Sequence, residues 1–350
     1  MSPAVEPDVL AVEEGVLGHL TLNRPRAINA LTLGMVRAID AALDRWQDDP
    51  AIACVLLDGA GGRGLCAGGD IVTLQEAAKS GEHRPAEEFW REEYHLNARI
   101  ACYPKPFVVL MDGIVMGGGV GLSAHASHRL ATASLTIAMP EVGIGFAPDV
   151  GGTWLLSRAP GEIGAHLALT GARIGVDDAL LCGLADRLID AEAAAALAGR
   201  LAAGGLEAVM AGLGAPRGSA APLAAARGWI DDCYGADEVE EILARLRARP
   251  EEEARRAAAT IEGMSPTSLK VTRRALREAR GLPDLRTCLE HEYRISCAFL
   301  DSHDFVEGVR AAVIDKDREP RWDPATLDRV AAAAVDRFFA PVAVELGLAA

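Results

Sequence analysis

The sequence FVVLMDGIVMGGGVG, residues 107–121, places a short apolar run ahead of a run of glycines. Its first five residues, Phe107–Met111, have the length and composition of a buried strand. The glycines at 117–119 follow where a helix is expected to open, and the bare backbone N–H groups of a helix start favour negative charge. The stretch therefore predicts a strand–loop–helix unit, the building block of α/β folds.

Similar units surround this stretch. Residues 16–22 and 52–57 are predicted as strands, and residues 129–138 as an extended segment. Thr32 is expected to cap an amphipathic helix whose apolar residues recur at helical spacing, namely Met35, Ile39, Leu43 and Trp46. Residues 71–103 are predicted to be mainly helical. The repeated order predicts an α/β fold, although no repeat of fixed period is found.

The chain changes character in its second half. Residues 202–226 are rich in Ala, Gly and Pro, and we place a boundary there, between a core of residues 1–205 and a mainly helical region of residues 206–350. Ser265 followed by Pro266 predicts a helix that runs to about Arg280. The last twenty-five residues are rich in Ala and Val and are expected to form a terminal helix.

Composition excludes several classes of protein. The 350 residues are 50% hydrophobic and 24% charged, which is typical of a globular protein. The net charge of −15 disfavours non-specific binding to nucleic acid. An anionic ligand would also gain nothing from long-range attraction, so local donors have to hold it.

The cysteines and the N-terminus indicate a compartment. The seven cysteines are odd in number and lack the spacing of metal ligands, which predicts reduced thiols in a cytoplasmic protein. The acidic first fourteen residues do not resemble a signal peptide, and we find no apolar run of the ~18 residues that a membrane helix needs. The eight histidines form no ligand pattern, so we expect no metal site.

The tract MPEVGIGFAPDVGG, residues 139–152, holds the strongest candidates for chemistry. Glu141 and Asp149 lie eight residues apart among apolar residues and glycines. Buried carboxylates are costly unless they are paired or do chemistry. Either could instead be a satisfied structural carboxylate, and Asp149 could cap a following helix. The tract therefore suggests acid–base or nucleophilic work on a carbonyl group.

Two glycine-rich loops could assist that chemistry. Residues 59–70, GAGGRGLCAGGD, and the glycine run at 117–119 each follow a predicted buried strand. Each loop could supply one backbone N–H to the same carbonyl oxygen. Taken singly, the first could be a flexible surface turn, and the second could serve tight strand–helix packing. Neither contains a Walker-type phosphate loop.

For Glu92, Cys66 and Ser123, which are also of reactive types, the sequence favours no catalytic role. Glu92 and Glu93 stand beside aromatics in FWREEY, residues 89–94, and a solvated helix face is the default for Glu92. Cys66 lacks a recognisable His or Asn partner, so it is expected to be a packed small hydrophobe. Ser123 is not in a Gly-x-Ser-x-Gly elbow, which disfavours a serine hydrolase of that type.

These motifs together resemble the crotonase (enoyl-CoA hydratase/isomerase) superfamily. The resemblance covers nearly everything from residue 16 to residue 324, and it begins at LNRPRAINAL, residues 22–31. Its best match is the 3-hydroxyisobutyryl-CoA hydrolase branch. The marks of that branch are FWREEY at 89–94, MSPTSLK at 264–270, HDFVEGVR at 303–310 and IDKD at 314–317.

The resemblance implies a crotonase-type spiral of repeated ββα units with a helical C-terminal region. It also implies roles for single residues. Gly69 and Gly118 would donate N–H groups to the thioester oxygen, and Glu141 would attack the carbonyl or activate water. Asp149 would manage protons and hold the 3-hydroxy group. Glu93 would position the acyl group. The loops 24–29 and 66–70 would cradle the adenine and phosphates of CoA. The substrate-binding residues besides Glu93 would be Arg26, Ala27, Asn29, Ala67, Gly68, Asp70 and Gly117.

One position distinguishes the hydrolase from the hydratases that it resembles. Typical hydratases carry a second catalytic glutamate three residues after the middle glycine of the oxyanion loop, and this chain has Gly121 there. The resemblance therefore implies hydrolysis of 3-hydroxyisobutyryl-CoA in valine breakdown, without a metal or redox cofactor. The alternative is an enoyl-CoA hydratase or isomerase acting on another acyl-CoA. A binding-only member of the family also stays open, as does a homo-oligomer.

Overall fold

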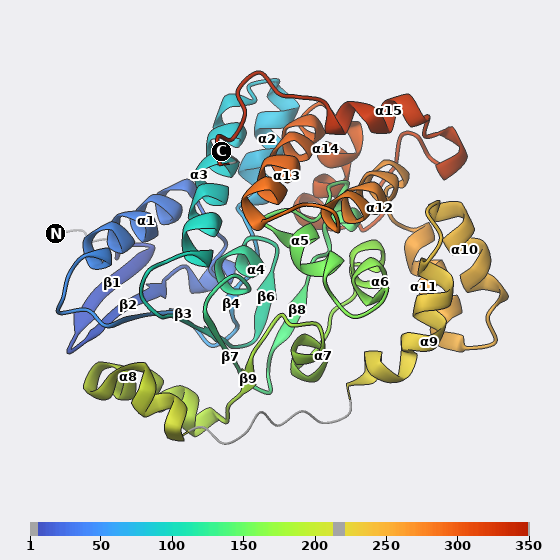
Figure 1. The fold of residues 1–350 in the computed structure, drawn as a ribbon. Coiled ribbons are helices and arrows are strands. Elements are labelled where there is room, and N and C mark those ends of the chain that lie inside the picture. Colours follow the sequence, from blue (N-terminus) through green and yellow to red (C-terminus); the bar gives the residue numbers. More distant parts are fainter. Residues whose placement is uncertain (1–5, 213–220, 349–350) are drawn as a thin grey trace.

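The computed structural model describes residues 6–212 and 221–348 and contains two sheets (Figure 1). The larger sheet has six strands in the order β1-β2-β3-β5-β7-β9, and all neighbours except β1 and β2 are parallel. Its strands are β1 (Val9–Glu14), β2 (Leu17–Leu22), β3 (Cys54–Gly59), β5 (Phe107–Met111), β7 (His128–Ala131) and β9 (Arg187–Leu188). The predicted α/β class is confirmed.

The smaller sheet is parallel and has three strands of three residues each, in the order β4-β6-β8. The strands are β4 (Gly64–Cys66), β6 (Ile114–Met116) and β8 (Thr136–Ala138). The extended segment expected at 129–138 is thus two strands, β7 and β8, which belong to different sheets. The strand β1 was not predicted; it pairs antiparallel with β2 at the edge of the larger sheet.

Of the helices of the first half, α1, α4 and α8 lie directly against the sheets, whereas α2, α5, α6 and α7 pack mainly on other helices. Thr32 caps α1 as predicted, since its hydroxyl accepts from the N–H of Met35 at 3.2 Å. The segment 71–103 forms two helices that meet at Gly81, whose φ of 73° ends the first. The helices are α1 (Leu33–Gln47), α2 (Ile71–Ser80), α3 (Arg84–Ala101), α4 (Gly118–Ser123), α5 (Gly152–Ser157), α6 (Ile163–Thr170), α7 (Val176–Leu181) and α8 (Ala191–Gly212).

The helix α8 covers the outer face of the larger sheet (Figure 1). Its Leu197, Leu201 and Val209 are buried in a cluster with side chains of β2, β3, β5 and β7. By length and composition α8 could cross a membrane, which the sequence analysis overlooked. However, Gly205 has φ 65° and ψ −171°, so the backbone is not helical there. The buried side of α8 packs on β2 and β3.

The second half is mainly helical, as expected. Its helices are α9 (Pro222–Tyr234), α10 (Val239–Ala248), α11 (Glu252–Glu262), α12 (Pro266–Ala279), α13 (Leu285–Phe299), α14 (His303–Val309) and α15 (Ala332–Asp336). The predicted cap of α12 is present, because the Ser265 hydroxyl accepts from the N–H of Ser268 at 3.1 Å. The division at 205/206 stays a prediction, and part of the Ala/Gly/Pro-rich stretch, 213–220, lies outside the described residues.

The expectation of a terminal helix is wrong. Within residues 326–348 the structure has only the five residues of α15 and two short 3-10 turns, η4 (Leu327–Arg329) and η5 (Arg337–Phe339). The tail beyond them is held by side chains: the Arg91 guanidinium donates to the carbonyls of Val344 and Glu345, at 2.8 and 2.7 Å. The segment 344–345 therefore lies against α3 (Figure 1).

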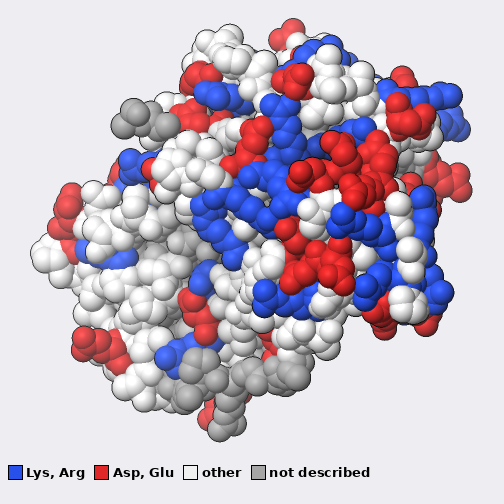
Figure 2. Space-filling view, turned by 45° about the vertical axis from the view of Figure 1, so that its right-hand side comes forward, with Lys and Arg blue, Asp and Glu red and all other residues white. Residues whose placement is uncertain are grey.

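Charged residues gather on the C-terminal helices. Figure 2 shows Lys and Arg interleaved with Asp and Glu over this side of the molecule, while much of the remaining face is uncharged. The carboxylate of Glu162, for example, forms ion pairs with Arg273, Arg277 and Arg280. The charges on this face are therefore largely paired with each other, which explains how a protein of net charge −15 can carry dense cationic clusters.

Candidate active site

The carboxyl ends of the three short strands meet at one cavity of about 200 Å³. The loop after β4 brings Ala67, Gly68 and Gly69, and the loop after β6 brings Gly117 and Gly118. The loop after β8 leads to Glu141, the first residue of a 3-10 turn, η2 (Glu141–Ile144). In parallel sheets, ligands bind at the carboxyl ends of strands. The small sheet is therefore the element that assembles the site.

The two glycine loops lie against each other as the sequence suggested. Gly68 has φ 117° and Gly117 has φ 48°, conformations that L side chains rarely adopt. A Cβ on Gly118 would lie 3.3 Å from the nitrogen of Gly69 and 2.6 Å from Oε1 of Glu93. Within residues 6–212 and 221–348, neither Gly69 nor Gly118 donates its N–H to another backbone group. Both N–H groups are thus free to serve an oxyanion.

Three buried carboxyl groups line the same cavity: Glu93 from α3, Glu141 from η2, and Asp149. Glu93 and Glu141 each have one buried oxygen without a hydrogen-bond partner in the described part of the chain. Burial raises the pKa of both groups well above the usual range, and the proximity of Asp149 raises it further. Unpaired buried acids of this kind are typical of functional sites.

Asp149 differs from the other two because it has a donor. The Tyr94 hydroxyl donates to its Oδ2 at 2.7 Å, and Tyr94 in turn lies 2.7 Å from the Ser296 hydroxyl. Burial raises the pKa of Asp149 to about 7, while the hydrogen bond from Tyr94 pulls it down. Of the three carboxyl groups, Asp149 is therefore the one that ionises most readily.

Glu292 of α13 takes over the structural role that we considered for Asp149. Its carboxylate accepts from the N–H groups of Gly151 and Thr153, at 2.6 and 2.8 Å, at the start of α5. The side chain of Asp149 makes no capping bond to that helix. Burial raises the pKa of Glu292 to about 8, although these hydrogen bonds lower it. A distant residue caps α5, which leaves Asp149 free to face the cavity.

The turn that carries Glu141 is packed directly against α14. A Cβ on Gly145 would lie 1.9 Å from the carbonyl oxygen of Asp304, and a Cβ on Gly308 would lie 2.3 Å from the backbone of Ile144. The two backbones can approach this closely only because both positions are glycine. The carboxylate of Asp304 is buried and accepts from the Ser265 hydroxyl at 2.5 Å. The C-terminal motifs at 264–270 and 303–310 thus hold the Glu141 turn in place.

Gly121 has no room for a side chain. Gly121 lies inside α4, and a Cβ there would be 2.6 Å from Cβ of Val150 and 2.9 Å from Nδ2 of Asn97. Asn97 is fully buried on α3, and neither of its amide atoms has a partner in the described residues. Asn97 and Val150 therefore occupy the space into which a glutamate at position 121 would extend.

The structure does not bring every predicted residue to the cavity. Eight of the predicted residues line it, namely Ala67, Gly68, Gly69, Glu93, Gly117, Gly118, Glu141 and Asp149. Four do not: Arg26, Ala27, Asn29 and Asp70. Asn29 is fully buried, and its amide binds backbone groups of residues 24, 60, 64 and 65, which suits a structural role better than substrate contact. Contact of these four with substrate stays a prediction.

Sequence reasoning missed Tyr94, Asn97 and Glu292. Tyr94 was within reach, since it directly follows Glu93 in a motif that the sequence analysis singled out. Glu292 gave no signal, because it meets Gly151 across 141 residues of chain. Cys66 is fully buried as expected, and burial raises its pKa to about 12, so it stays a thiol.

Comparisons with known proteins show the family of the chain. A family model described as enoyl-CoA hydratase/isomerase matches residues 17–339. The chain belongs to this family. It is 42% identical over 342 residues to the mitochondrial 3-hydroxyisobutyryl-CoA hydrolase of Rattus norvegicus, covering 95% of this chain and 88% of that protein. The human enzyme of the same name is 42% identical over 333 residues, covering 92% and 86%.

Two solved structures are similar along the whole chain but carry other names. A carnitinyl-CoA dehydratase from Mycobacterium thermoresistibile is 49% identical with a TM-score of 0.94, covering 98% of this chain and 99% of that one. An enoyl-CoA hydratase from Rhodobacter sphaeroides 2.4.1 is 42% identical with a TM-score of 0.89, covering 96% and 98%. The fold is thus shared by proteins named as hydrolases, hydratases and dehydratases.

The comparisons correct one expectation. The sequence analysis placed the protein in the cytoplasm, on the grounds of its cysteines and its N-terminus. The curated relatives are mitochondrial hydrolases, so that expectation is wrong. Reduced thiols are equally compatible with such a compartment, which is why cysteine usage could not separate the two.

Proposed function

We propose that this protein hydrolyses 3-hydroxyisobutyryl-CoA, a short-chain 3-hydroxyacyl-CoA thioester, to the free acid and CoA, a step of valine breakdown. The observation that carries the proposal is the packing of Gly121 against Asn97 and Val150. A second acid cannot enter from that position, whereas Glu141 and Asp149 share the cavity with the two glycine N–H groups. The hydrolases among the curated relatives support the same choice.

The geometry suggests how each group acts. The N–H groups of Gly69 and Gly118 stabilise the oxyanion that forms when the thioester carbonyl is attacked. Glu141 attacks the carbonyl carbon to give an anhydride, which water then cleaves, or it activates water for direct attack. In both routes the C–S bond breaks, and the thiolate leaves and takes up a proton. Asp149, the most easily ionised of the three acids, accepts and returns protons and binds the 3-hydroxy group.

A hydratase is the second candidate, and one observation favours it. The carboxyl group of Glu93 lies beside Gly118 with one oxygen unpartnered in the described chain, so Glu93 could replace the acid missing at position 121. The names of the two similar solved structures point the same way. Hydration of a double bond needs two acid–base groups, and Glu93 with Glu141 would supply them.

The deciding experiment measures both reactions on one preparation. Free thiol release from 3-hydroxyisobutyryl-CoA is followed with a thiol reagent, and hydration of crotonyl-CoA by loss of absorbance, for wild type, Glu141→Ala and Glu93→Gln. We expect thiol release that vanishes in Glu141→Ala, with negligible hydration. Hydration without thiol release, abolished in Glu93→Gln, would establish the hydratase instead. Binding without either reaction would indicate a binding protein. A homo-oligomer and the lack of a metal or redox cofactor stay predictions.

A further inference from the structure

The tail segment, residues 344–348, is bound through its backbone by side chains of α3. The Arg91 guanidinium donates to the carbonyls of residues 344–346, at 2.8, 2.7 and 3.3 Å. The His95 ring donates to the carbonyl of Leu346 at 3.0 Å. Arg91 and His95 are four residues apart, so they lie on one face of α3. That face holds the tail segment, and neither of the two residues lines the cavity.

The tail segment is also bound by α13. The Glu290 carboxylate accepts from the N–H groups of Leu346 and Leu348, at 3.1 and 2.5 Å. Four residues further along the helix, Arg294 pairs with the carboxylate of Glu345 at 2.9 Å. The side chain of Leu346 is only 3% exposed and packs in the hydrophobic core. The tail segment therefore bridges two helices that also pack against each other.

Other side chains of the same two helices hold Asp149. On α3, the Tyr94 hydroxyl donates its proton to Asp149 at 2.7 Å. On α13, Ser296 therefore donates to the Tyr94 oxygen, also at 2.7 Å. Glu292 of α13 caps α5, which starts three residues after Asp149. The geometry between Tyr94 and Asp149 thus depends on how α3 and α13 are placed against each other.

Tyr293 of α13 connects the tail-binding residues with those that hold Asp149. The guanidinium carbon of Arg91 lies 4.8 Å from the centre of the Tyr293 ring. The same ring packs edge-on against Tyr94, with the two centroids 6.2 Å apart. Cation–π and edge-to-face contacts of this kind favour a defined geometry. A displacement of Arg91 would therefore reach Tyr94 through a single side chain.

Several titratable side chains face Asp149, and they come from each element packed around it: Glu93, Tyr94, Glu141 and Glu292. The His125 ring binds the carbonyl of Val150 at 2.8 Å, and burial lowers its pKa to about 4, so it carries no charge at neutral pH. In the part of the chain that the structure describes, Tyr94 is the one side chain that donates a hydrogen bond to Asp149. The Tyr94 contact therefore decides how readily Asp149 ionises.

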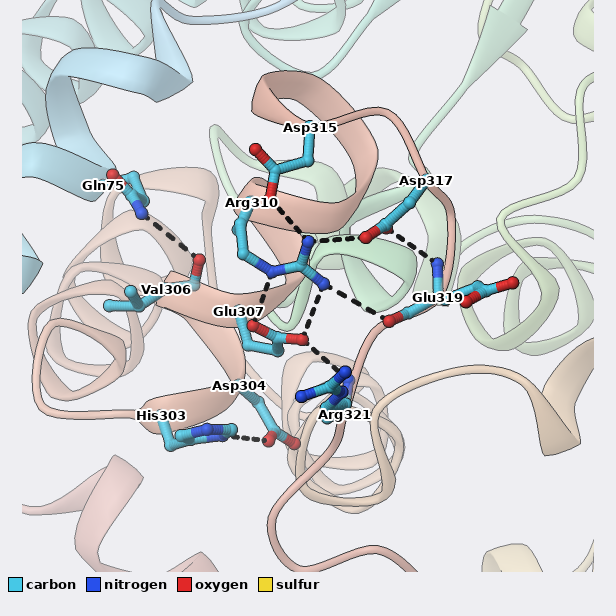
Figure 3. A network of polar contacts seen from close by, with 10 residues as sticks. All are labelled: Gln75, His303, Asp304, Val306, Glu307, Arg310, Asp315, Asp317, Glu319 and Arg321. Carbon is cyan, nitrogen blue, oxygen red and sulfur yellow. Dashed lines mark hydrogen bonds and ion pairs between the residues drawn. The ribbon is translucent and has the colours of Figure 1, made fainter.

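A second arginine, Arg310, holds a different stretch of the C-terminal region (Figure 3). Its guanidinium binds four residues that are at most nine positions away along the chain: Glu307, Asp315, Asp317 and Glu319. This cluster directly follows α14, which packs on the turn that carries Glu141. Arg91 instead binds carbonyls 253 to 255 residues away, on helices that hold Asp149. The two arginines can therefore be compared, because each holds part of the C-terminal region beside a different acid.

We propose that the tail segment positions Tyr94 for its hydrogen bond to Asp149, with Arg91 and Glu290 as positioning residues that act from outside the cavity. By bridging α3 and α13, the segment fixes the placement of the two helices that hold Asp149. Release of the segment weakens the bond from Tyr94, and the pKa of Asp149 then rises. The inference rests on the proposed function only for its kinetic measurement, since the ionisation of Asp149 can be followed without substrate.

The test releases the tail segment with Leu346→Asp, which puts a carboxylate in place of a buried apolar side chain. One measurement is kcat/KM for thiol release between about pH 5 and 9. The other is the titration of Asp149 without substrate, by NMR of isotope-labelled carboxyl carbons assigned with Asp149→Asn. Both midpoints should move upward by up to about one unit, so that kcat/KM on the acidic side falls up to about tenfold.

Arg91→Lys is a second way to loosen the tail segment, and it carries the test if Leu346→Asp does not fold. Lysine keeps the charge but replaces a fork that reaches three carbonyls with a single ammonium group. Both midpoints should move in the same direction as in Leu346→Asp, by a smaller amount. Unmoved midpoints in both variants would overturn the inference.

Three variants are controls and should keep the wild-type midpoints. Val344→Asp adds the same charge two residues away, on a side chain that is 66% exposed. Leu346→Met keeps an apolar anchor of similar volume. Arg310→Lys loosens the local cluster beside the Glu141 turn. An equal shift in Val344→Asp or Arg310→Lys would overturn the inference, because general loosening of the C-terminal region would then explain it.

The titration of Asp149 separates this inference from the proposed function. If Leu346→Asp moves that titration in a protein that releases no thiol from 3-hydroxyisobutyryl-CoA, the inference stands and the proposed function fails. If thiol release is present but the titration of Asp149 does not move in Leu346→Asp or Arg91→Lys, the proposed function stands and the inference fails.

Discussion

The two sheets of this molecule divide stability from chemistry. In the larger sheet, β3 and β5 are apolar and buried almost throughout, and β2, β3, β5 and β7 pack on α8 through side chains such as Leu56 and Val108. The smaller sheet has strands of only three residues, and its value lies in the loops at their ends. Those loops are glycine-rich and face unpaired carboxyl groups. A protein can maintain such costly features only when another part of the fold stabilises it.

The largest effect, a loss of kcat, is expected from a substitution in a loop of the smaller sheet. In Gly118→Ala the new methyl group would lie 2.6 Å from Oε1 of Glu93 and crowd the N–H of Gly69. We expect kcat to fall roughly a thousandfold, because oxyanion donors act only when they are accurately placed. Steady-state kinetics of thiol release and a thermal melt measure the two consequences. The control is Gly199→Ala on α8, where a Cβ meets nothing within 4 Å. It should leave kcat unchanged and should not lower the Tm, because alanine favours the helix more than glycine does.

A substitution in the larger sheet should instead lower stability and leave turnover unchanged. Leu56→Ala removes a fully packed side chain of β3 and should lower the free energy of unfolding by about 3 kcal/mol. The turnover number of the folded fraction should stay that of wild type, because β3 contributes no residue to the cavity. Denaturant titration together with kinetics on the soluble fraction tests this. If Leu56→Ala lowered kcat as strongly as Gly118→Ala, the division between the sheets would be wrong.

Local motifs could be predicted from the sequence, whereas contacts between distant segments could not. The glycine loops and the pair Glu141 and Asp149 could be found because each lies in a short local motif after an apolar strand. The helix cap by Glu292 could not, since it joins residues 141 positions apart. The last residues were expected to be helical from their Ala and Val content, but carbonyl contacts to Arg91 hold them in an irregular path. Local patterns predict elements, whereas contacts between distant segments decide what a side chain does.

A smaller effect should distinguish Asp149 from its two neighbours. Tyr94→Phe removes the hydrogen bond that lowers the pKa of Asp149, so that pKa should rise above its present value of about 7. If ionised Asp149 is needed for turnover, the acidic limb of the pH–rate profile should move to higher pH by about one unit. The measurement is kcat/KM for thiol release between about pH 5 and 9.

The matched control for Tyr94→Phe is Tyr293→Phe. The Tyr293 ring packs edge-on against Tyr94, but its hydroxyl binds Arg91 instead of Asp149. It loses the same atom from the same neighbourhood and should keep the wild-type profile. A profile that moves equally in both variants would mean that packing, and not the hydrogen bond, sets the protonation of Asp149.

The smallest expected effect concerns the thermal stability that the protein loses by burying the carboxyl group of Glu93. Burial and Asp149 raise the pKa of Glu93 well above the usual range, so near neutral pH the folded protein holds a proton that the unfolded chain has already released. For a carboxyl group with a raised pKa, the native state is favoured at low pH and loses stability as pH rises through the range between the two pKa values. Glu93→Gln imitates the protonated acid and cannot ionise. Its Tm should match wild type near pH 5 and exceed it by a few degrees near pH 8. Parallel Tm–pH curves for the two proteins would show instead that Glu93 is ionised in the folded protein. The site at the smaller sheet would then destabilise the fold less than the contrast between the two sheets implies.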